Sequence, residues 1–190
     1  PIAGLGALSV GQDPSGVAVG EGAAVAAVLS ANGVSVVRAG GSTARRIDTR
    51  AGLIAPAIDD FGYIWSVPAN SPGDIIAYNY EGAGEPVAVT MPAGSIIVSL
   101  DISQDNTRLA MLLQTPVGPK LIVAAIVRDP ARGFLPTSIG APVLDTLIDS
   151  DAAVDATWID RFSVATLTNT DDGSIVTAFE IGGQRVSLGR

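Results

Sequence analysis

The residues with the clearest potential for chemistry are acidic side chains in the second half of the chain. Carboxylates in a loop suit Ca²⁺, which takes roughly six to eight oxygen ligands. The candidates are Asp145, Asp149, Asp151, Asp155 and Asp160. Their spacing does not match the Asp-x-Asp-x-Asp-Gly calcium loop, and Ser150 and Ala152 interrupt it. The stretch Asp145–Asp160 is therefore interpreted first as a solvated acidic loop, and calcium binding is the alternative.

Three further sites invite a chemical interpretation. Asp59 and Asp60 could serve as an acid and a base, but adjacent strand residues point to opposite faces, so a turn is favoured. The stretch 169–173 resembles part of a calcium loop, yet its Asp172-Gly173 pair first predicts a hairpin turn. Lys120 begins a predicted strand beside a turn, and it is interpreted as a solvated surface lysine.

The chain has no His and no Cys. Ser-His and Cys-His nucleophile pairs, disulfides and thiolate metal sites are therefore excluded. The stretches Gly4-Leu5-Gly6 and Gly20-Glu21-Gly22 lack the third glycine and the helix of a dinucleotide site. Trp65 and Trp158 are predicted to pack in the core, with a ligand platform in a central channel as the alternative. We predict no catalytic, cofactor-binding or metal-binding residue, and no enzyme.

The composition limits the partners. The net charge of −8 disfavours nucleic acid and adhesion to anionic lipid, since both repel an acidic surface. The apolar runs are far shorter than the roughly 20 residues that span a bilayer, so no direct membrane insertion is expected. A hydrophobic content of 47% with 16% charged residues indicates a folded chain.

Short apolar runs separated by turns must position these side chains. The clearest stretch predicts three strands in a row: Leu100–Ser103, Arg108–Gln114 and Lys120–Arg128. The turn 104–107 contains Asn106, a residue type that tolerates positive φ. The second and third strands are apolar almost without interruption, which predicts strands covered on both faces.

This order of strands recurs four times. The first strands of the groups end near Val19, Ile58, Ile102 and Trp158, at intervals of roughly 40 to 55 residues, the spacing of β-propeller blades. We therefore predict an all-β propeller with four four-stranded blades at 16–48, 53–90, 98–139 and 152–188. Residues 1–15 would be a linker or the outer strand of a preceding blade.

The third interval is the longest. We interpret Asp129–Ser150 as an insertion between blades, with the fourth strand of that blade in Phe134–Ile139 or slightly later. At most one short helical turn is expected, at Leu144–Ala152. Four blades can close a ring, but we expect part of a larger propeller. Uncovered blade faces of such an array would favour self-association.

Three segments together resemble the β-propeller domain of the actinobacterial lipoprotein LpqB. The first runs from Ile54 through Asp59 and Gly62 to Trp65. The other two are 102–129, ending in Ile126-Val127-Arg128-Asp129, and 154–160. The family usually has Gly where Asn106 stands and an aromatic residue where Ile58 stands.

The resemblance implies a function that the residues alone do not give. The parent would be an exported lipoprotein, anchored to the cell membrane by an N-terminal lipid. It would modulate the sensor histidine kinase of the Mtr two-component system through the kinase's extracytoplasmic domain, without catalysis. Two alternatives remain open: a metal-dependent propeller hydrolase or lactonase, and a small-ligand or glycan binder that uses its two tryptophans.

Overall fold

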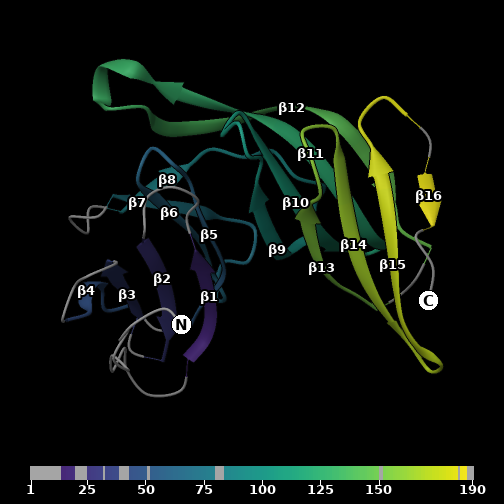
Figure 1. The fold of residues 1–190 in the computed structure, drawn as a ribbon, viewed down its shortest axis with the longest axis horizontal. Helices are drawn as coiled ribbons and strands as arrows, with labels where there is room; N and C mark the ends of the chain where they lie inside the picture. The colour runs from purple at the N-terminus through teal and green to yellow at the C-terminus, as the bar shows by residue number, and fades with distance from the viewer. Residues whose placement is uncertain are drawn as a thin grey trace, which may run out of the picture.

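The structure is a computed structural model, and it describes residues 14–19, 25–31, 33–38, 43–50, 52–79, 84–149, 152–183 and 185–187. Nearly every regular element in these ranges is a β-strand (Figure 1). The one helical element described there is a 3₁₀ turn, Pro130–Arg132. None of the described segments forms a helix with the length and apolar character needed to cross a bilayer.

The strands form four antiparallel sheets of four strands, each in sequence order, called blades 1 to 4 here. Blade 1 contains β1 (Pro14–Val19), β2 (Val25–Ser30), β3 (Gly33–Arg38) and β4 (Arg45–Asp48). Blade 2 contains β5 (Leu53–Ile58), β6 (Tyr63–Pro68), β7 (Ile75–Asn79) and β8 (Gly84–Val87). Blade 3 contains β9 (Ile96–Ile102), β10 (Arg108–Thr115), β11 (Gly118–Asp129) and β12 (Leu135–Leu147). Blade 4 contains β13 (Ala153–Trp158), β14 (Ser163–Thr170), β15 (Gly173–Glu180) and β16 (Arg185–Ser187).

Consecutive blades pack face to face, and each contact buries its own apolar cluster. Leu29 and Val34 of blade 1 meet Ile64 of blade 2. The other clusters lie between blades 2 and 3 and between blades 3 and 4. The inner strands β1, β5, β9 and β13 are neighbours in that order. This radial stacking confirms the predicted four-bladed propeller, because each blade covers the apolar face of the next.

The central strands owe their burial to this arrangement. In β10, Leu109 and Met111 face blade 2, whereas Ala110 and Leu112 face blade 4. All four side chains are buried. A strand with apolar residues on both sides can only be stable where both faces are covered, as its continuous run predicted.

The predicted insertion at Asp129–Ser150 is wrong. Residues 135–147 form β12, the fourth strand of blade 3, which continues well past the expected end at Ile139. Leu144 pairs with Val123 in this strand, so the helical turn expected from Leu144 does not form. The extra residues lengthen the β11–β12 hairpin, which interrupts its ladder with bulges; bulges absorb extra residues without breaking a sheet.

The long hairpin also joins blade 2 by backbone contacts, and it extends beyond the rest of blade 3 toward blade 2 in Figure 1. The Ala88 N–H donates to the Thr137 carbonyl at 3.0 Å, and the Ile139 N–H donates to the Ala88 carbonyl at 2.8 Å. Ala88 and Ser138 form a parallel bridge. Main-chain pairing therefore crosses the boundary between two sheets.

One polar group in the core predicts a stabilising substitution. The Thr166 hydroxyl is buried without a hydrogen-bond partner among the described residues, and Thr166 is 1% exposed. Thr166→Val keeps the shape and removes an unsatisfied group, so the free energy of unfolding should rise by about 1 kcal/mol in urea titrations. The control is Thr168→Val. The Thr168 hydroxyl donates to the Ile175 carbonyl at 3.3 Å, so its removal should not raise the free energy of unfolding. Equal gains from both variants would contradict the argument.

Candidate functional site

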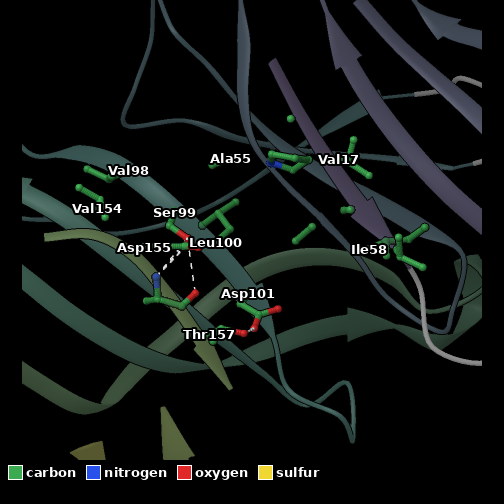
Figure 2. A pocket seen from close by; sticks show the side chains of 16 residues that line it. Val17, Ala55, Ile58, Val98, Ser99, Leu100, Asp101, Val154, Asp155 and Thr157 are labelled. Atoms are coloured by element: carbon green, nitrogen blue, oxygen red, sulfur yellow. Dashed lines mark hydrogen bonds between the residues drawn. The ribbon is translucent and has the colours of Figure 1, made fainter. Parts of the chain in front are cut away.

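A cavity of about 420 Å³ lies where the four inner strands converge. Its lining differs between the two sides (Figure 2). Strands β1 and β5 contribute the aliphatic side chains of Val17, Ala55 and Ile58. Strands β9 and β13 contribute polar groups: Ser99, Asp101, Asp155 and Thr157. The cavity is therefore the central channel of the propeller, aliphatic along β1 and β5, and mixed apolar and polar with two carboxylates along β9 and β13.

The polar side chains of the channel are already bonded to one another across the boundary of blades 3 and 4. The Ser99 hydroxyl donates to Asp155 Oδ1 at 2.5 Å, and the Thr157 hydroxyl donates to Asp101 Oδ2 at 2.6 Å. Asp101 Oδ2 also accepts from the Trp158 N–H at 2.9 Å. Each strand thus supplies one hydroxyl and one carboxylate, and the chemistry visible here is structural hydrogen bonding.

A second group of polar and aromatic residues lies on the turns at one end of the blades, around Arg128. The Arg128 guanidinium forms an ion pair with Asp59 Oδ2 at 2.8 Å; the two side chains are 8% and 0% exposed. Asp59 also accepts from the Trp65 indole N–H at 3.0 Å and from the Tyr63 N–H at 2.8 Å. Buried charges need such partners, so the carboxylate is held in one position.

Two exposed phenylalanines continue this group to the surface. The Phe61 and Phe134 rings stack with centroids 4.9 Å apart, and the Arg128 guanidinium lies 4.6 Å from the Phe61 centroid. The Phe134 carbonyl accepts from Arg128 Nη1 at 3.2 Å. Phe134 has a φ of 61°, a costly backbone conformation for a residue other than glycine. The surrounding contacts hold it there.

The neighbouring turns are connected as well. The Asp60 N–H donates to Asn106 Oδ1 at 2.9 Å, and Asn106 Nδ2 donates to Asp60 Oδ2 at 2.9 Å. Asn106 has a φ of 59°, as its place in the turn predicted. Arg108 Nη1 donates to the Arg161 carbonyl at 2.9 Å, which links the β9–β10 turn to blade 4. Three consecutive turns thus form one continuous end face.

The carboxylates proposed from sequence as a calcium site are separated by the fold. Asp145 pairs with Lys120 at 2.6 Å on the outer part of blade 3, whereas Asp155 lies in the channel. Lys120, predicted to be a solvated lysine, is thus ion-paired and only 20% exposed at its side chain. Asp151 lies outside the described residues. Within the described ranges, no three acidic side chains are grouped closely enough to hold a metal ion.

The remaining candidates have structural contacts. Asp59 and Asp60 diverge as expected, one into the ion pair with Arg128 and the other toward Asn106. Residues 169–173 form the β14–β15 hairpin. Trp65 is fully buried in β6, and Trp158 in β13 is 9% exposed and donates to the Asp101 carbonyl. The two glycine-rich stretches, 4–6 and 20–22, lie outside the described residues.

Two turn aspartates have a lowered pKa. The Phe162 N–H donates to Asp160 and holds the pKa of that carboxyl below its ordinary value. Partial burial raises the pKa of Asp105, but the hydroxyls of Ser103 and Thr107 donate to it and bring its pKa below the usual value overall. Both carboxylates therefore stay ionised and serve as acceptors in their turns.

The ion pair of Asp59 with Arg128 is the feature that sequence reasoning missed. The two residues are far apart in the chain, and each alone fits a turn or a strand end. A signal was nonetheless present, because Asp59, Trp65 and Arg128 all belong to the segments that carry the family resemblance. Motif residues from separate segments that share no local role are candidates for contact with one another.

The sequence matches one protein family, described as the lipoprotein LpqB beta-propeller domain, over residues 1–189. No curated protein matches it. Among solved structures, the chain is similar to the hydrazine synthase of Kuenenia stuttgartiensis, with a TM-score of 0.62 and 20% identity over 93% of this chain and 54% of that chain.

Two further solved structures share the fold. A putative TolB from Agrobacterium tumefaciens has a TM-score of 0.56 and 14% identity over 77% of this chain and 50% of that one. An oligogalacturonate lyase in complex with manganese has a TM-score of 0.64 and 11% identity over 96% and 55%. At such identities the likeness shows a common propeller fold. The chain spans about half the length of these structures.

Proposed function

Because the chain belongs to the family of lipoprotein LpqB β-propeller domains, we propose that it is a non-catalytic, extracytoplasmic module that modulates a two-component sensor kinase by direct protein contact. The partner is the extracytoplasmic domain of the Mtr-type sensor histidine kinase. An N-terminal lipid on the full-length parent anchors the module to the cell membrane. The observation that carries the proposal is the family match over nearly the whole chain.

The architecture is consistent with docking. Packed blades provide a rigid scaffold, and loops on a rigid scaffold are the usual site of partner contacts. The strongest polar networks described above connect one blade to the next, as Ser99–Asp155 and Asp59–Arg128 do. Side chains that already bond to a neighbouring blade are poorly placed to act as acids, bases or nucleophiles.

The direct test is binding between the full-length protein and the extracytoplasmic domain of the sensor kinase from the same genome. Isothermal titration calorimetry should give saturable binding, with a periplasmic domain of an unrelated kinase as the control. Absence of heat at concentrations well above those expected for a transient interface would remove the proposed partner.

A metal-dependent propeller enzyme is the second candidate. It is favoured by the likeness to an oligogalacturonate lyase solved with manganese and by Asp101 and Asp155 beside the channel. The docking proposal predicts that about 1 mM Ca²⁺, Mn²⁺ or EDTA shifts the Tm by less than about 1 °C, since a ligand stabilises only a state that binds it. A rise of several degrees that disappears in Asp155→Asn would favour the enzyme instead.

A further inference from the structure

The phenylalanines of this chain are distributed unusually. The chain has four; only Phe179 is buried, at 3% exposure, whereas Phe61, Phe134 and Phe162 are 44%, 45% and 59% exposed. Phenylalanine is normally among the most buried residue types, so three exposed rings in a small domain call for a reason.

The three rings lie on the same end of the propeller. Phe61 is in the β5–β6 turn, Phe162 in the β13–β14 turn and Phe134 in the β11–β12 turn. In an antiparallel four-stranded blade, the turns after the first and third strands emerge at the same end. Arg128 at the end of β11 contacts Asp59 of blade 2, which places the β11–β12 turn beside the β5–β6 turn. We call this surface the aromatic face.

The stacked pair of the aromatic face is held in place before any partner arrives. The Phe61 ring contacts both the Phe134 ring and the guanidinium of Arg128, which is itself fixed by Asp59. Exposed aromatic anchors whose rotamers are already fixed lose little entropy on binding, which is the property of hot-spot residues. The left-handed backbone conformation of Phe134 costs free energy, and in this conformation the ring is exposed to solvent.

The charge around the rings indicates what docks there. Among the described residues, the turns of blades 2 to 4 around the rings carry four carboxylates besides those in the ion pairs with Arg128 and Arg132: Asp60, Asp105, Asp129 and Asp160. Arg128 and Arg132 are each paired with a carboxylate of blade 2, so Arg108 and Arg161 offset only part of this charge. An acidic surface with aromatic anchors repels a second copy of itself and anionic lipid, and attracts cationic side chains that pack on aromatic rings.

We propose that the aromatic face is the docking surface for a protein partner that presents arginine or lysine side chains beside aliphatic ones. This deepens the proposed function, on which it rests, by naming the surface and the chemistry of the partner.

The test compares the full-length protein with the variant Phe61→Ser/Phe134→Ser/Phe162→Ser. Binding to the kinase extracytoplasmic domain should weaken by at least about tenfold and should also weaken as NaCl rises. The control is Val117→Ser, because Val117 is 77% exposed on the β10–β11 turn at the opposite end of blade 3. If the triple variant does not melt cooperatively, Phe162→Ser alone replaces it in the comparison. The Phe162 ring makes no stacking contact among the described residues, so its removal should leave the fold intact.

Each outcome is decisive. If the triple variant still binds the kinase domain, the aromatic face is not the docking surface, and the proposed function is unaffected. If the wild-type protein does not bind the kinase domain, that partner fails, and peptides selected by phage display on the immobilised protein decide the surface. The aromatic face is supported if the selected peptides combine Arg or Lys with aliphatic residues and do not bind the triple variant. Any other selection result overturns the proposal. Phe-dependent binding to vesicles of phosphatidylcholine and phosphatidylglycerol would also overturn it, in favour of a membrane contact.

Discussion

Replacing Arg128 by Met is expected to lower the free energy of unfolding by about 3–5 kcal/mol. The substitution keeps most of the aliphatic volume but leaves Asp59 buried, at 0% exposure, without its cation. The Trp65 indole and the Tyr63 N–H still donate to this carboxylate, but neither carries a charge. Urea denaturation followed by tryptophan fluorescence reports the change directly, since Trp65 lies beside the site.

The matched control is Arg132→Met. Arg132 pairs with Glu85 between the same two blades, but the two side chains are 52% and 43% exposed. Water screens such a pair, and its loss should cost at most about 1 kcal/mol. If the two variants lose similar amounts of stability, the buried pair is no more than a surface contact, and the argument for its role is wrong.

Replacing Gly33 by Ala is expected to cost about 2–5 kcal/mol. Gly33 begins β3 with a φ of 107°, which side-chain-bearing residues rarely adopt. An added Cβ would also lie 2.0 Å from the Asp48 carbonyl oxygen. That atom belongs to the backbone of β4, so the clash can be relieved only by moving β3 and β4 apart.

Gly118 and Gly173 separate these two causes. They occupy the same hairpin position in blades 3 and 4, with φ values of 120° and 134°, and no described atom lies within 4 Å of a Cβ added there. Gly118→Ala and Gly173→Ala should therefore cost only the backbone strain, about 1–3 kcal/mol. Thermal melts of the three variants would refute the steric argument if Gly33→Ala were the mildest.

These hairpins also illustrate what the sequence could have revealed. A hydroxyl residue three positions before the glycine donates to the glycine carbonyl in blades 1, 3 and 4: Ser30 to Gly33, Thr115 to Gly118 and Thr170 to Gly173. This Ser/Thr-x-x-Gly spacing repeats blade by blade. It is a second mark of the propeller, independent of the spacing of the strands.

The fold was predictable because its main signals are local. Runs such as 109–113 and 121–124 are apolar on both faces, and this pattern requires covering sheets wherever the strand lies. The length of β12 was not predictable in this way, because most of residues 140–147 are exposed and none of them is fully buried. Their strand state comes from pairing with β11 instead.

The contacts of the turn residues were harder to predict from the sequence. Whether Asp59 ends in a solvated turn or in a buried ion pair depends on where Arg128 lies, and that position is fixed by the packing of two blades. Likewise, Asp101 and Asp155 become partners of hydroxyls only when β9 and β13 lie side by side. Contacts between distant segments of this kind carry little signal in a single sequence.

The backbone hydrogen bonds between Ala88 and residues 137–139 link blades 2 and 3, and among the described residues no other two blades are joined by main-chain bonds. Amide and carbonyl groups are common to all residue types except proline at the donor, so mutation can alter the side chains along this junction without breaking the link. The side chains of blades 2 and 3 can therefore diverge in evolution while the two blades stay hydrogen-bonded to each other. Only proline at position 88 or 139 would undo one of the two bonds directly.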